Sequence, residues 1–286
     1  MKTTASTEIF GVVGNPIRHS LSPILQNGWL KEAGYNAVYL AFEPKSEDIT
    51  GAINGLYMAQ IKGLNITAPF KTDAAAIAIN KSPEVKQIGA ANTLKQGKNG
   101  FDAYNTDGIG LVLDLDVRAA GWREKTNIIT ILGVGGAAKG VLHALLASGV
   151  KEIRLVGRDA ARTNNIVELA KSIQNSNGTS IVGYLWNEIA AAINGATLII
   201  NATPIGLKSG DSLKLDLKGA HTQAVVYDMT YAQTESDFLK SATAQNRRAL
   251  NGLGMLVGQG AYAFHTWFGQ MPDFNKGLDR LSKLDR

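Results

Sequence analysis

The chain has 286 residues, of which 45% are apolar and 19% charged, and these proportions are typical of a soluble globular protein with room for two domains. It contains no cysteine, which excludes disulfide bonds, thiolate metal sites and cysteine nucleophiles. The N-terminal stretch has no apolar signal core, and no apolar run approaches the length of a membrane span. We therefore expect a cytoplasmic protein.

The formal net charge is +5, but Lys and Arg are spread along the chain rather than clustered. The dense basic stripe with interleaved aromatic residues that is typical of nucleic-acid binding is not found. The charge therefore indicates a solvated basic surface or an anionic small ligand. We expect neither nucleic acid nor a membrane as a partner, and the sequence leaves a homodimer open.

In the first half of the chain, short apolar runs alternate with amphipathic stretches. The apolar runs predict four strands, at 9–14, 37–43, 61–67 and 88–94. The amphipathic stretches predict helices at 22–34 and 45–59, and Ser22 followed by Pro23 is a typical start for the first of them. This alternation predicts an α/β fold with a largely parallel sheet.

A second series of strands and helices occupies the second half. The strands are predicted at 127–132, 152–156, 197–203 and 224–230. Their continuous apolar character suits a parallel sheet that is covered on both faces. The composition changes between Gly121 and Lys125, which predicts a domain border there.

Residues 133–140, GVGGAAKG, follow one of these strands and open a helix. Gly133, Gly135 and Ala138 match the G-x-G-x-x-G/A fingerprint of dinucleotide-binding loops. The first glycine permits a tight turn, the second lets the backbone approach a pyrophosphate, and the small third residue lets helix and strand pack closely. We therefore predict that the dinucleotide binds at Gly133, Gly135, Gly136, Ala137 and Ala138, with a purely structural turn as the alternative.

The segment GRDAAR, after the strand predicted at 152–156, bears on the identity of the dinucleotide. An acidic residue here would accept hydrogen bonds from the ribose of NAD, whereas arginine suits the 2′-phosphate of NADP. Arg158 and Arg162 lie four residues apart at a helix start, so both can face one phosphate. Asp159 would favour NAD, or would cap the following helix. We predict NADP as the cofactor, with NAD less favoured.

Polar residues follow several of the strands predicted in the first half of the chain. Ligands bind outside the carboxyl ends of strands in open parallel sheets, so these side chains are expected to meet at one site. Each has a local alternative as a helix cap, turn former or strand residue, but the shared location favours a binding site. The candidates are Ser20, Ser22, Asn65, Thr67, Lys71, Asn92 and Asp107.

The chemistry of these side chains indicates a class of reaction. Hydroxyls and amides both donate and accept hydrogen bonds, which suits a polyhydroxylated substrate. Lys71 and Asp107 would form a proton-transferring pair, because reduction of a carbonyl by hydride requires a proton for the developing alkoxide. The nicotinamide would supply the hydride. The sequence thus predicts an oxidoreductase.

Seven motifs run in order along nearly the whole chain: GNPIRHSLSP, NITAPFK, GAANT, NTDG, GVGGAAKG, NATPIG and NGLGMLVGQGAYAF. Together they resemble the shikimate dehydrogenases. The resemblance implies reversible, NADP-linked interconversion of 3-dehydroshikimate and shikimate, with Lys71 and Asp107 as the catalytic pair. It implies that the residues that bind substrate are Ser20, Ser22, Asn65, Thr67, Asn92, Tyr231 and Gln259. It also implies that Asn201, Thr203 and Met255 lie close to the cofactor.

The resemblance further implies a discontinuous substrate domain. Residues 1–108 with 253–286 would form an α/β substrate-binding domain, and 109–252 a Rossmann-type NADP-binding domain. The helical tail from about Leu253 would return to the first domain and place Gln259 opposite Lys71.

Three positions depart from the family pattern. Gln233 stands where a proline is usual, Asn251 where an aspartate is common, and residues 157–159 read Gly-Arg-Asp where Asn-Arg-Thr is common. The last departure leaves a strict preference for NADP open. None of the three changes Lys71 or Asp107.

Other functions also remain open. A relative of this fold could oxidise quinate with NAD, in which case Ser22 could matter for the extra hydroxyl. A dehydrogenase for a folate-linked one-carbon unit would not explain the serines of HSLSP, and a non-catalytic dinucleotide sensor would have no use for Lys71. No metal is expected, since the spacing of His19, His143, His221 and His265 is not that of metal ligands.

Overall fold

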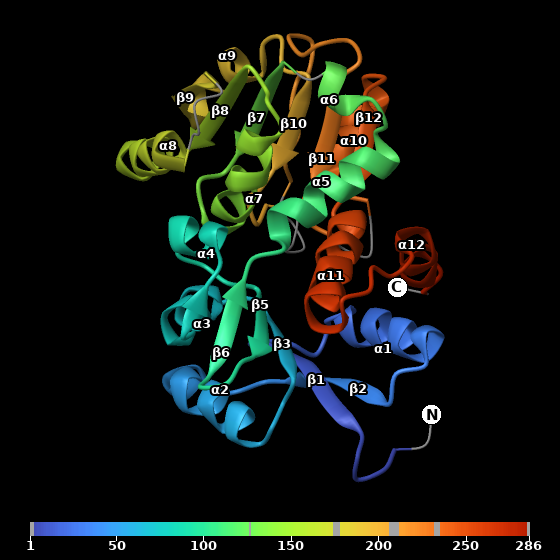
Figure 1. The fold of residues 1–286 in the computed structure, drawn as a ribbon. Helices are drawn as coiled ribbons and strands as arrows, with labels where there is room; N and C mark the ends of the chain where they lie inside the picture. Colours follow the sequence, from blue (N-terminus) through green and yellow to red (C-terminus); the bar gives the residue numbers. More distant parts are fainter. Residues whose placement is uncertain (1–2, 126, 174–177, 206–211, 232–234, 285–286) are drawn as a thin grey trace. The chain divides into compact units, whose positions relative to one another are not determined.

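The computed structural model describes residues 3–125, 127–173, 178–205, 212–231 and 235–284 (Figure 1). The chain divides into two compact units, residues 1–110 with 256–285 and residues 111–255. Each unit contains a six-stranded sheet. The α/β fold with a helical return of the C-terminal segment to the first unit is therefore confirmed. The composition change at 121–125, however, lies inside the second unit, in α6 (Trp122–Lys125), so the border predicted there was wrong.

The sheet of the first unit has the order β2-β1-β3-β5-β6-β4. Its strands are β1 (Glu8–Val13), β2 (Ala37–Phe42), β3 (Gly63–Ile66), β4 (Asn80–Lys81), β5 (Thr93–Gln96) and β6 (Phe101–Tyr104). β5 runs antiparallel to both of its neighbours, whereas the other pairs are parallel. The sheet is therefore mixed. The connection between β5 and β6 is too short for the crossover that parallel strands need, so these two strands form an antiparallel hairpin.

The strand predicted at 88–94 was largely wrong. Residues 83–88 form α4 (Pro83–Ile88), and β5 begins only at Thr93. Pro83 occupies the first turn, and Gly89 ends the helix in the left-handed conformation with φ +68°. Both residues are typical helix boundaries, which outweighed the apolar run in this segment.

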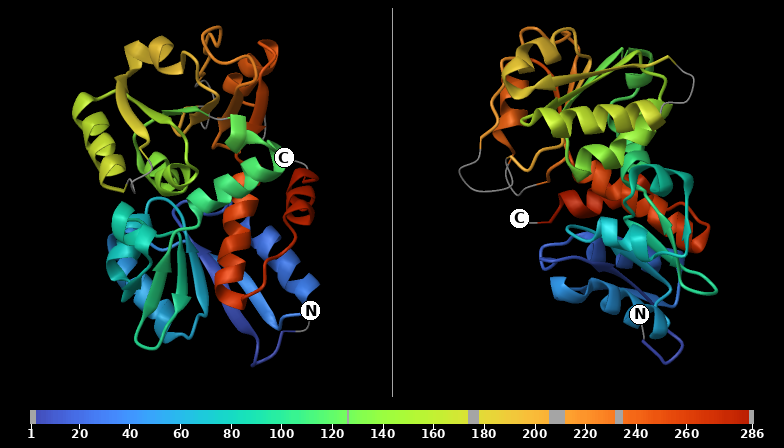
Figure 2. Two further views of the ribbon diagram at one scale, coloured as in Figure 1. Left: turned by 45° about the horizontal axis from the view of Figure 1, so that its top comes forward. Right: turned by 90° about the vertical axis from the view of Figure 1, so that its left-hand side faces the viewer.

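The helices of the first unit surround this sheet. Besides α4 they are α1 (Ser22–Ala33), α2 (Ile49–Met58), α3 (Lys71–Ile77), α12 (Phe274–Ser282) and most of α11 (Leu253–Phe268). The predicted helix at 45–59 is a short 3₁₀ turn, Ser46–Asp48, followed by α2, because the Asp48 carboxylate caps α2 by accepting from the Gly51 N–H. From the C-terminal segment, α12 packs against α1 (Figures 1 and 2).

The second unit has an all-parallel sheet of order β12-β11-β10-β7-β8-β9. Its strands are β7 (Ile128–Leu132), β8 (Glu152–Gly157), β9 (Ser180–Leu185), β10 (Leu198–Asn201), β11 (Val225–Asp228) and β12 (Arg248–Asn251). When the strands are numbered within the unit, this is the doubly wound order 3-2-1-4-5-6 of dinucleotide-binding sheets. The order of the strands reverses between β7 and β10. The strands β9 and β12 were not predicted.

Four helices of the second unit connect these parallel strands: α7 (Gly136–Ala147), α8 (Ala160–Ile173), α9 (Ile189–Ile193) and α10 (Asp237–Ala244). The unit also contains α6 and most of α5 (Asp107–Arg118), which precede β7. The central strands are buried: Ile131, Ile153 and Ile199 are fully enclosed. Burial on both faces explains their continuous apolar sequences.

A buried polar cluster anchors α5 within the second unit. The carboxylate of Asp114, which is fully buried, accepts hydrogen bonds from the Arg118 guanidinium and the Tyr227 hydroxyl. Burial and the neighbouring Asp114 carboxylate raise the pKa of Tyr227 well above its usual value. Gly254 must be glycine here, because a Cβ would lie 2.0 Å from Asp114 Oδ1.

At the other end of α5, glycines allow a close crossing with α11. A Cβ on Gly110 would lie 2.3 Å from the Gln259 backbone nitrogen, and one on Gly258 would lie 2.4 Å from the Gly110 carbonyl oxygen. Distances under about 3 Å are incompatible with van der Waals packing, so the two backbones can lie this close only because glycine has no side chain. The crossing therefore sets the position of Gln259 relative to α5.

We predict that Gly110→Ala lowers the free energy of unfolding by about 1–3 kcal/mol, because overpacking forces two backbones apart. The matched control is Gly55→Ala in α2, where a Cβ would meet nothing within 4 Å. That substitution should be neutral or stabilise by up to about 1 kcal/mol, since alanine favours helix. Urea unfolding of both variants measures the difference, and equal midpoints would contradict the role of the crossing.

Candidate functional site

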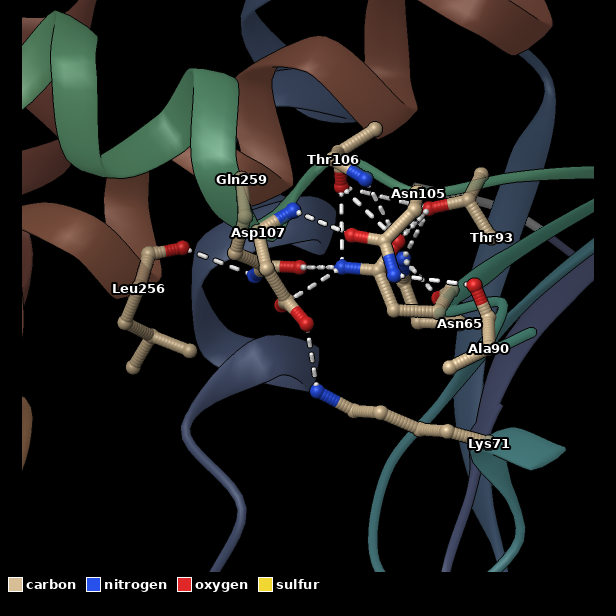
Figure 3. Close-up of polar contacts among 10 residues, drawn as sticks. Asn65, Lys71, Ala90, Thr93, Asn105, Thr106, Asp107, Leu256 and Gln259 are labelled. Atoms are coloured by element: carbon tan, nitrogen blue, oxygen red, sulfur yellow. Dashed lines mark hydrogen bonds and ion pairs between the residues drawn. The ribbon is translucent and has the colours of Figure 1, made fainter. Parts of the chain in front are cut away.

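Most of the polar residues predicted in the first half of the chain meet at one place in the first unit (Figure 3). Asn65 lies on β3, Lys71 is the first residue of α3, Asn92 directly precedes β5, and Asp107 begins α5. Gln259 reaches the same place from α11. The structure thus brings together side chains from five elements.

The Asp107 carboxylate lies at the centre of this cluster. Its Oδ2 accepts a hydrogen bond from Lys71 Nζ at 2.7 Å, and its Oδ1 accepts one from Asn92 Nδ2 at 2.8 Å. The Asp107 side chain is 11% exposed and that of Lys71 is 33% exposed. The carboxylate is therefore held on both oxygens, while the Lys71 side chain remains partly exposed.

The Asn92 amide is itself fixed by its surroundings. Its Oδ1 accepts from the Thr106 backbone N–H at 2.8 Å and from the Thr93 hydroxyl at 2.9 Å. A backbone N–H can only donate, so the oxygen must point to Thr106 and the nitrogen to Asp107. The Gln259 Oε1 lies 3.4 Å from the same nitrogen. Asn92 is 3% exposed, so this network is buried and satisfied within the protein.

The NTDG motif positions Asp107 through the residue two places before it. Asn105 Oδ1 accepts from the Asp107 backbone N–H at 3.0 Å, and Asn105 Nδ2 donates to the Ala90 carbonyl at 3.0 Å. Asp107 was predicted from the sequence, whereas Asn105, Thr106 and Thr93 were not. Asparagine before a helix start is a recognised capping signal, so Asn105 could have been found.

The other predicted substrate-binding residues are dispersed. Ser20 precedes α1, and its hydroxyl accepts from the Ser22 backbone N–H at 3.3 Å. Ser22 is the first residue of α1 and is 7% exposed. Thr67 follows β3, where its methyl group occupies the space that a Cβ on Gly14 would need. Tyr231 belongs to the second unit and is 37% exposed. The neighbouring Gln233 lies outside the described residues.

The glycine loop of the second unit joins β7 to α7. Gly133 has φ +106°, and a Cβ there would lie 3.0 Å from both the Ala202 carbonyl oxygen and the Thr203 side chain. Gly135 and Gly136, in contrast, have open space where a Cβ would stand. Ala138 is fully buried, as close packing of helix and strand requires. The loop follows β7, next to the point where the strand order reverses, and such sheets bind their ligands at this point.

The residues of this loop fit a dinucleotide pyrophosphate. The N-cap residue of α7, Gly135, provides no side-chain cap, and the first turn contains no acidic residue. The first backbone N–H groups of the helix thus keep their capacity for an anion, and the helix dipole favours a negative charge there. Ala137 lies in this first turn and is exposed.

The structure gives Asp159 a local role. Its Oδ1 accepts from the Arg162 backbone N–H at 2.8 Å, so it caps α8 as the alternative interpretation proposed. Arg158 and Arg162 are both exposed beside the end of β8. Gly157, one of the departures from the family pattern, is required by packing, since a Cβ would lie 2.1 Å from the Thr163 hydroxyl.

Asn201 and Thr203 interact mainly with each other and with the protein. Asn201 Oδ1 accepts from the Thr203 backbone and hydroxyl, at 3.0 and 2.6 Å, and Asn201 Nδ2 donates to Asp228 Oδ1 at 3.1 Å. Asn201 and Asp228 are fully buried. The sequence analysis missed Asp228, which ties the loops after β10 and β11 together. Met255, at the start of α11, is 9% exposed.

The described part of the chain contains no group of three or more His, Asp or Glu side chains placed to hold a metal ion. Its helices include none that is both long and apolar enough to span a bilayer.

A doubly wound sheet with a glycine loop, together with a lysine–aspartate pair in a separate α/β unit, defines the class of two-domain, dinucleotide-dependent oxidoreductases. Family models narrow the class. The shikimate dehydrogenase substrate binding domain matches residues 12–94, and the shikimate 5′-dehydrogenase C-terminal domain matches residues 252–281.

Individual proteins agree with these matches. The shikimate dehydrogenase (NADP(+)) of Caulobacter vibrioides is 37% identical over 270 residues, which cover 94% of this chain and 92% of the relative. The crystal structure of the Aquifex aeolicus shikimate dehydrogenase has a TM-score of 0.86 at 32% identity, covering 97% and 98% of the two chains. That of the Listeria monocytogenes enzyme in complex with shikimate and NAD has a TM-score of 0.88 at 28% identity, covering 98% of each chain. The chain belongs to the shikimate dehydrogenase family.

The buried network around Asp107 can be tested at the Asn92 amide, which donates to the carboxylate. We predict that Asn92→Ala lowers the free energy of unfolding by about 1–3 kcal/mol, because buried groups of Asp107 and Thr106 lose their partner. The control is Asn80→Ala, which removes an amide that donates to the Asp102 carboxylate at 2.7 Å on the exposed surface. That variant should change the free energy by less than about 0.5 kcal/mol. Similar losses in denaturant unfolding of the two variants would show that Asn92 is not the centre of a buried network.

Proposed function

We propose that this protein is an NADP-dependent shikimate dehydrogenase, which reversibly reduces 3-dehydroshikimate to shikimate. Membership of the family supports this proposal, as does the doubly wound sheet with its glycine loop. The single observation that carries the chemistry is the 2.7 Å contact between Lys71 Nζ and Asp107 Oδ2 in a buried polar cluster. A dinucleotide-binding protein without turnover has no need for this pair.

The proposed substrate-binding domain, residues 1–108 with 253–286, corresponds largely to the first unit, residues 1–110 with 256–285. Its polar cluster presents hydroxyl, amide and ammonium groups, which suit the hydroxyls and the carboxylate of shikimate. The proposed substrate-binding residues in this unit are Ser20, Ser22, Asn65, Thr67, Asn92 and Gln259, with Tyr231 contributed by the second. Since Asn92 Nδ2 already donates to Asp107, substrate binding would share or displace one of the existing bonds of the amide.

Lys71 is the proposed proton donor and acceptor at the reacting oxygen. One N–H of its ammonium group is directed at Asp107, which leaves two for a substrate oxygen. In the direction of reduction the Lys71 ammonium group gives a proton to the oxygen and becomes the neutral amine, and in the direction of oxidation the neutral amine takes the hydroxyl proton. Asp107 orients Lys71 and stabilises its charge, and Asn92 holds Asp107 in place.

The proposed NADP-binding domain, residues 109–252, corresponds largely to the second unit, residues 111–255. The loop residues Gly133, Gly135, Gly136, Ala137 and Ala138 would hold the pyrophosphate through the N-terminus of α7. When bound, the nicotinamide supplies or accepts the hydride. Thr203 and Met255 are proposed to lie close to the cofactor. Asn201 would act through Thr203, because its own amide is buried and bonded.

Arg158 and Arg162 are the proposed contacts for the 2′-phosphate that distinguishes NADP from NAD. Both are exposed, and the main chain between them is held by the Asp159 cap. Relatives differ in the cofactor that their names give, with NADP for the Caulobacter vibrioides enzyme and NAD in the Listeria monocytogenes complex. The two arginines favour NADP here. Action in the cytoplasm and a homodimer remain predictions.

Absorbance at the reduced-nicotinamide band, with shikimate or quinate and either cofactor, tests the proposal directly. We expect the fastest reduction of NADP with shikimate, and a Lys71→Ala variant should lower kcat by about 10²–10⁴ with little change in NADP binding. The control is Lys62→Ala, which removes another lysine of the same unit. In the wild type, Lys62 Nζ donates to the Gln96 side chain.

The outcomes of this assay separate the alternatives. Faster oxidation of quinate with NAD would support the quinate dehydrogenase, and NADP binding without turnover of either substrate would support a sensor. Turnover by Lys71→Ala close to that of the wild type would remove Lys71 from the mechanism.

Cofactor preference has its own test. Arg158→Ala and Arg162→Ala should each raise the KM for NADP by roughly 10- to 100-fold, since each loses a charge-assisted hydrogen bond to phosphate worth about 1.5–3 kcal/mol. The KM for NAD should stay within about twofold. Lys171→Ala, at the far end of α8, removes the same charge and should change neither. A parallel rise of both KM values in the arginine variants would contradict recognition of the 2′-phosphate.

A further inference from the structure

Tyr39 is a buried residue of β2 that lies outside the polar cluster around Asp107. It is 1% exposed, and its ring lies against Trp267 of α11, with 6.1 Å between ring centroids. Asn27 of α1 fixes its backbone on both sides: Asn27 Nδ2 donates to the Tyr39 carbonyl at 2.8 Å, and Asn27 Oδ1 accepts from the Tyr39 N–H at 2.9 Å. The ring therefore has a defined position on the sheet.

The Tyr39 hydroxyl reaches across β1 to a residue of the polar cluster. Tyr39 is paired with Phe10 of β1, and Asn65 of β3 is paired with Val12. Phe10 and Val12 are two residues apart on one strand, so all four side chains lie on the same face of the sheet. The Tyr39 hydroxyl donates to Asn65 Oδ1 at 2.7 Å.

The remaining bonds of Asn65 settle the orientation of its amide. Asn65 Nδ2 donates to the Asn92 backbone carbonyl and to the Thr93 hydroxyl, both at 3.2 Å (Figure 3 shows Asn65 and Thr93). A carbonyl oxygen can only accept, so the nitrogen of Asn65 must point to Asn92 and its oxygen to Tyr39. Both N–H groups are then used, and one lone pair of Oδ1 is left after these bonds. Asn65 can accept a hydrogen bond from a ligand but has no N–H left to give.

Ser22, another proposed substrate-binding residue, also influences this hydroxyl. Burial raises the pKa of Tyr39 well above its usual value, and a hydrogen bond with the Ser22 side chain opposes that rise. Ser22 is the first residue of α1 and is 7% exposed. Tyr39 is thus hydrogen-bonded to Asn65 and influenced by Ser22, two residues that come from different elements and are expected to face the substrate.

We propose that Tyr39 is a positioning residue for substrate binding, which holds the Asn65 amide so that its oxygen accepts a hydrogen bond from a substrate hydroxyl. This inference rests on the proposed function, since it assigns Asn65 and Ser22 to the shikimate site. It adds a residue outside the polar cluster and a direction for one of the hydrogen bonds. Tyr39 acts only through its two neighbours.

Tyr39→Phe is the direct test, because it removes one oxygen and keeps the ring that packs against Trp267. The KM for shikimate should rise about tenfold, while kcat and the KM for NADP stay within about twofold, as expected when binding energy common to ground and transition states is lost. The control is Tyr57→Phe, whose hydroxyl donates to the Gly97 and Lys98 carbonyls in the same unit. It should leave all three constants unchanged.

A second measurement separates positioning from a merely structural role. Calorimetry compares shikimate with analogues in which one non-reacting hydroxyl is replaced by hydrogen. The wild-type enzyme should lose about tenfold in affinity for one analogue, and Tyr39→Phe should bind that analogue as weakly as shikimate itself, because the coupling between the two groups is gone. A structural role would lower the melting temperature but leave this difference intact.

The results distinguish this inference from the proposed function. Wild-type turnover of shikimate together with an unchanged KM in Tyr39→Phe would overturn the role of Tyr39 alone. A wild-type affinity that is insensitive to every removed non-reacting hydroxyl would overturn it as well, whether or not the variant folds. If the wild-type enzyme turns over neither shikimate nor 3-dehydroshikimate, the proposed function fails and this inference falls with it.

Discussion

The sharing of the Asp107 carboxylate between Lys71 and Asn92 is the interaction on which the rest of the site depends. A carboxylate bonded on both oxygens cannot rotate, so the ammonium group that it holds is kept in one place. Asp107 is also the first residue of α5, and the Asp114 cluster with Arg118 and Tyr227 anchors the rest of that helix. The start of α5 and the position of the proposed proton donor are thus parts of one arrangement in the first unit.

Hydrogen-bond capacity explains why the surroundings of this carboxylate are so rich in amides. Buried polar groups that lack a partner cost free energy, and each amide satisfied by a backbone group is left with one orientation. Asn92, Asn65 and Gln259 are all oriented in this way, by the Thr106 N–H and by the carbonyls of Asn92 and Leu256. Donors and acceptors are therefore arranged before any substrate arrives, which reduces the ordering cost of binding.

In the second unit, packing explains why Gly157 departs from the family pattern, a departure that left the preference for NADP over NAD open. Gly157 stands where the family commonly has asparagine, yet its position against the Thr163 hydroxyl leaves no room for a Cβ. Asp159, the neighbouring departure, caps α8. Neither residue therefore argues for NAD, and the proposed preference for NADP depends on Arg158 and Arg162.

The sequence alone determined the two-part α/β organisation, most strands, the glycine loop and the candidates Lys71, Asp107, Asn65 and Asn92, because periodicity and strand-end polarity are local properties. The mixed first sheet and the crossing of Gly110 with Gly258 were decided by contacts between distant segments. Tyr39 shows this most clearly. Nothing in AVYLAF distinguishes it from a core tyrosine, and only the packing of β2, β1 and β3 into one sheet puts its hydroxyl 2.7 Å from Asn65. A hydrogen bond between residues 26 apart is a property of the fold, since the chain between them contributes nothing to their distance until the strands pair.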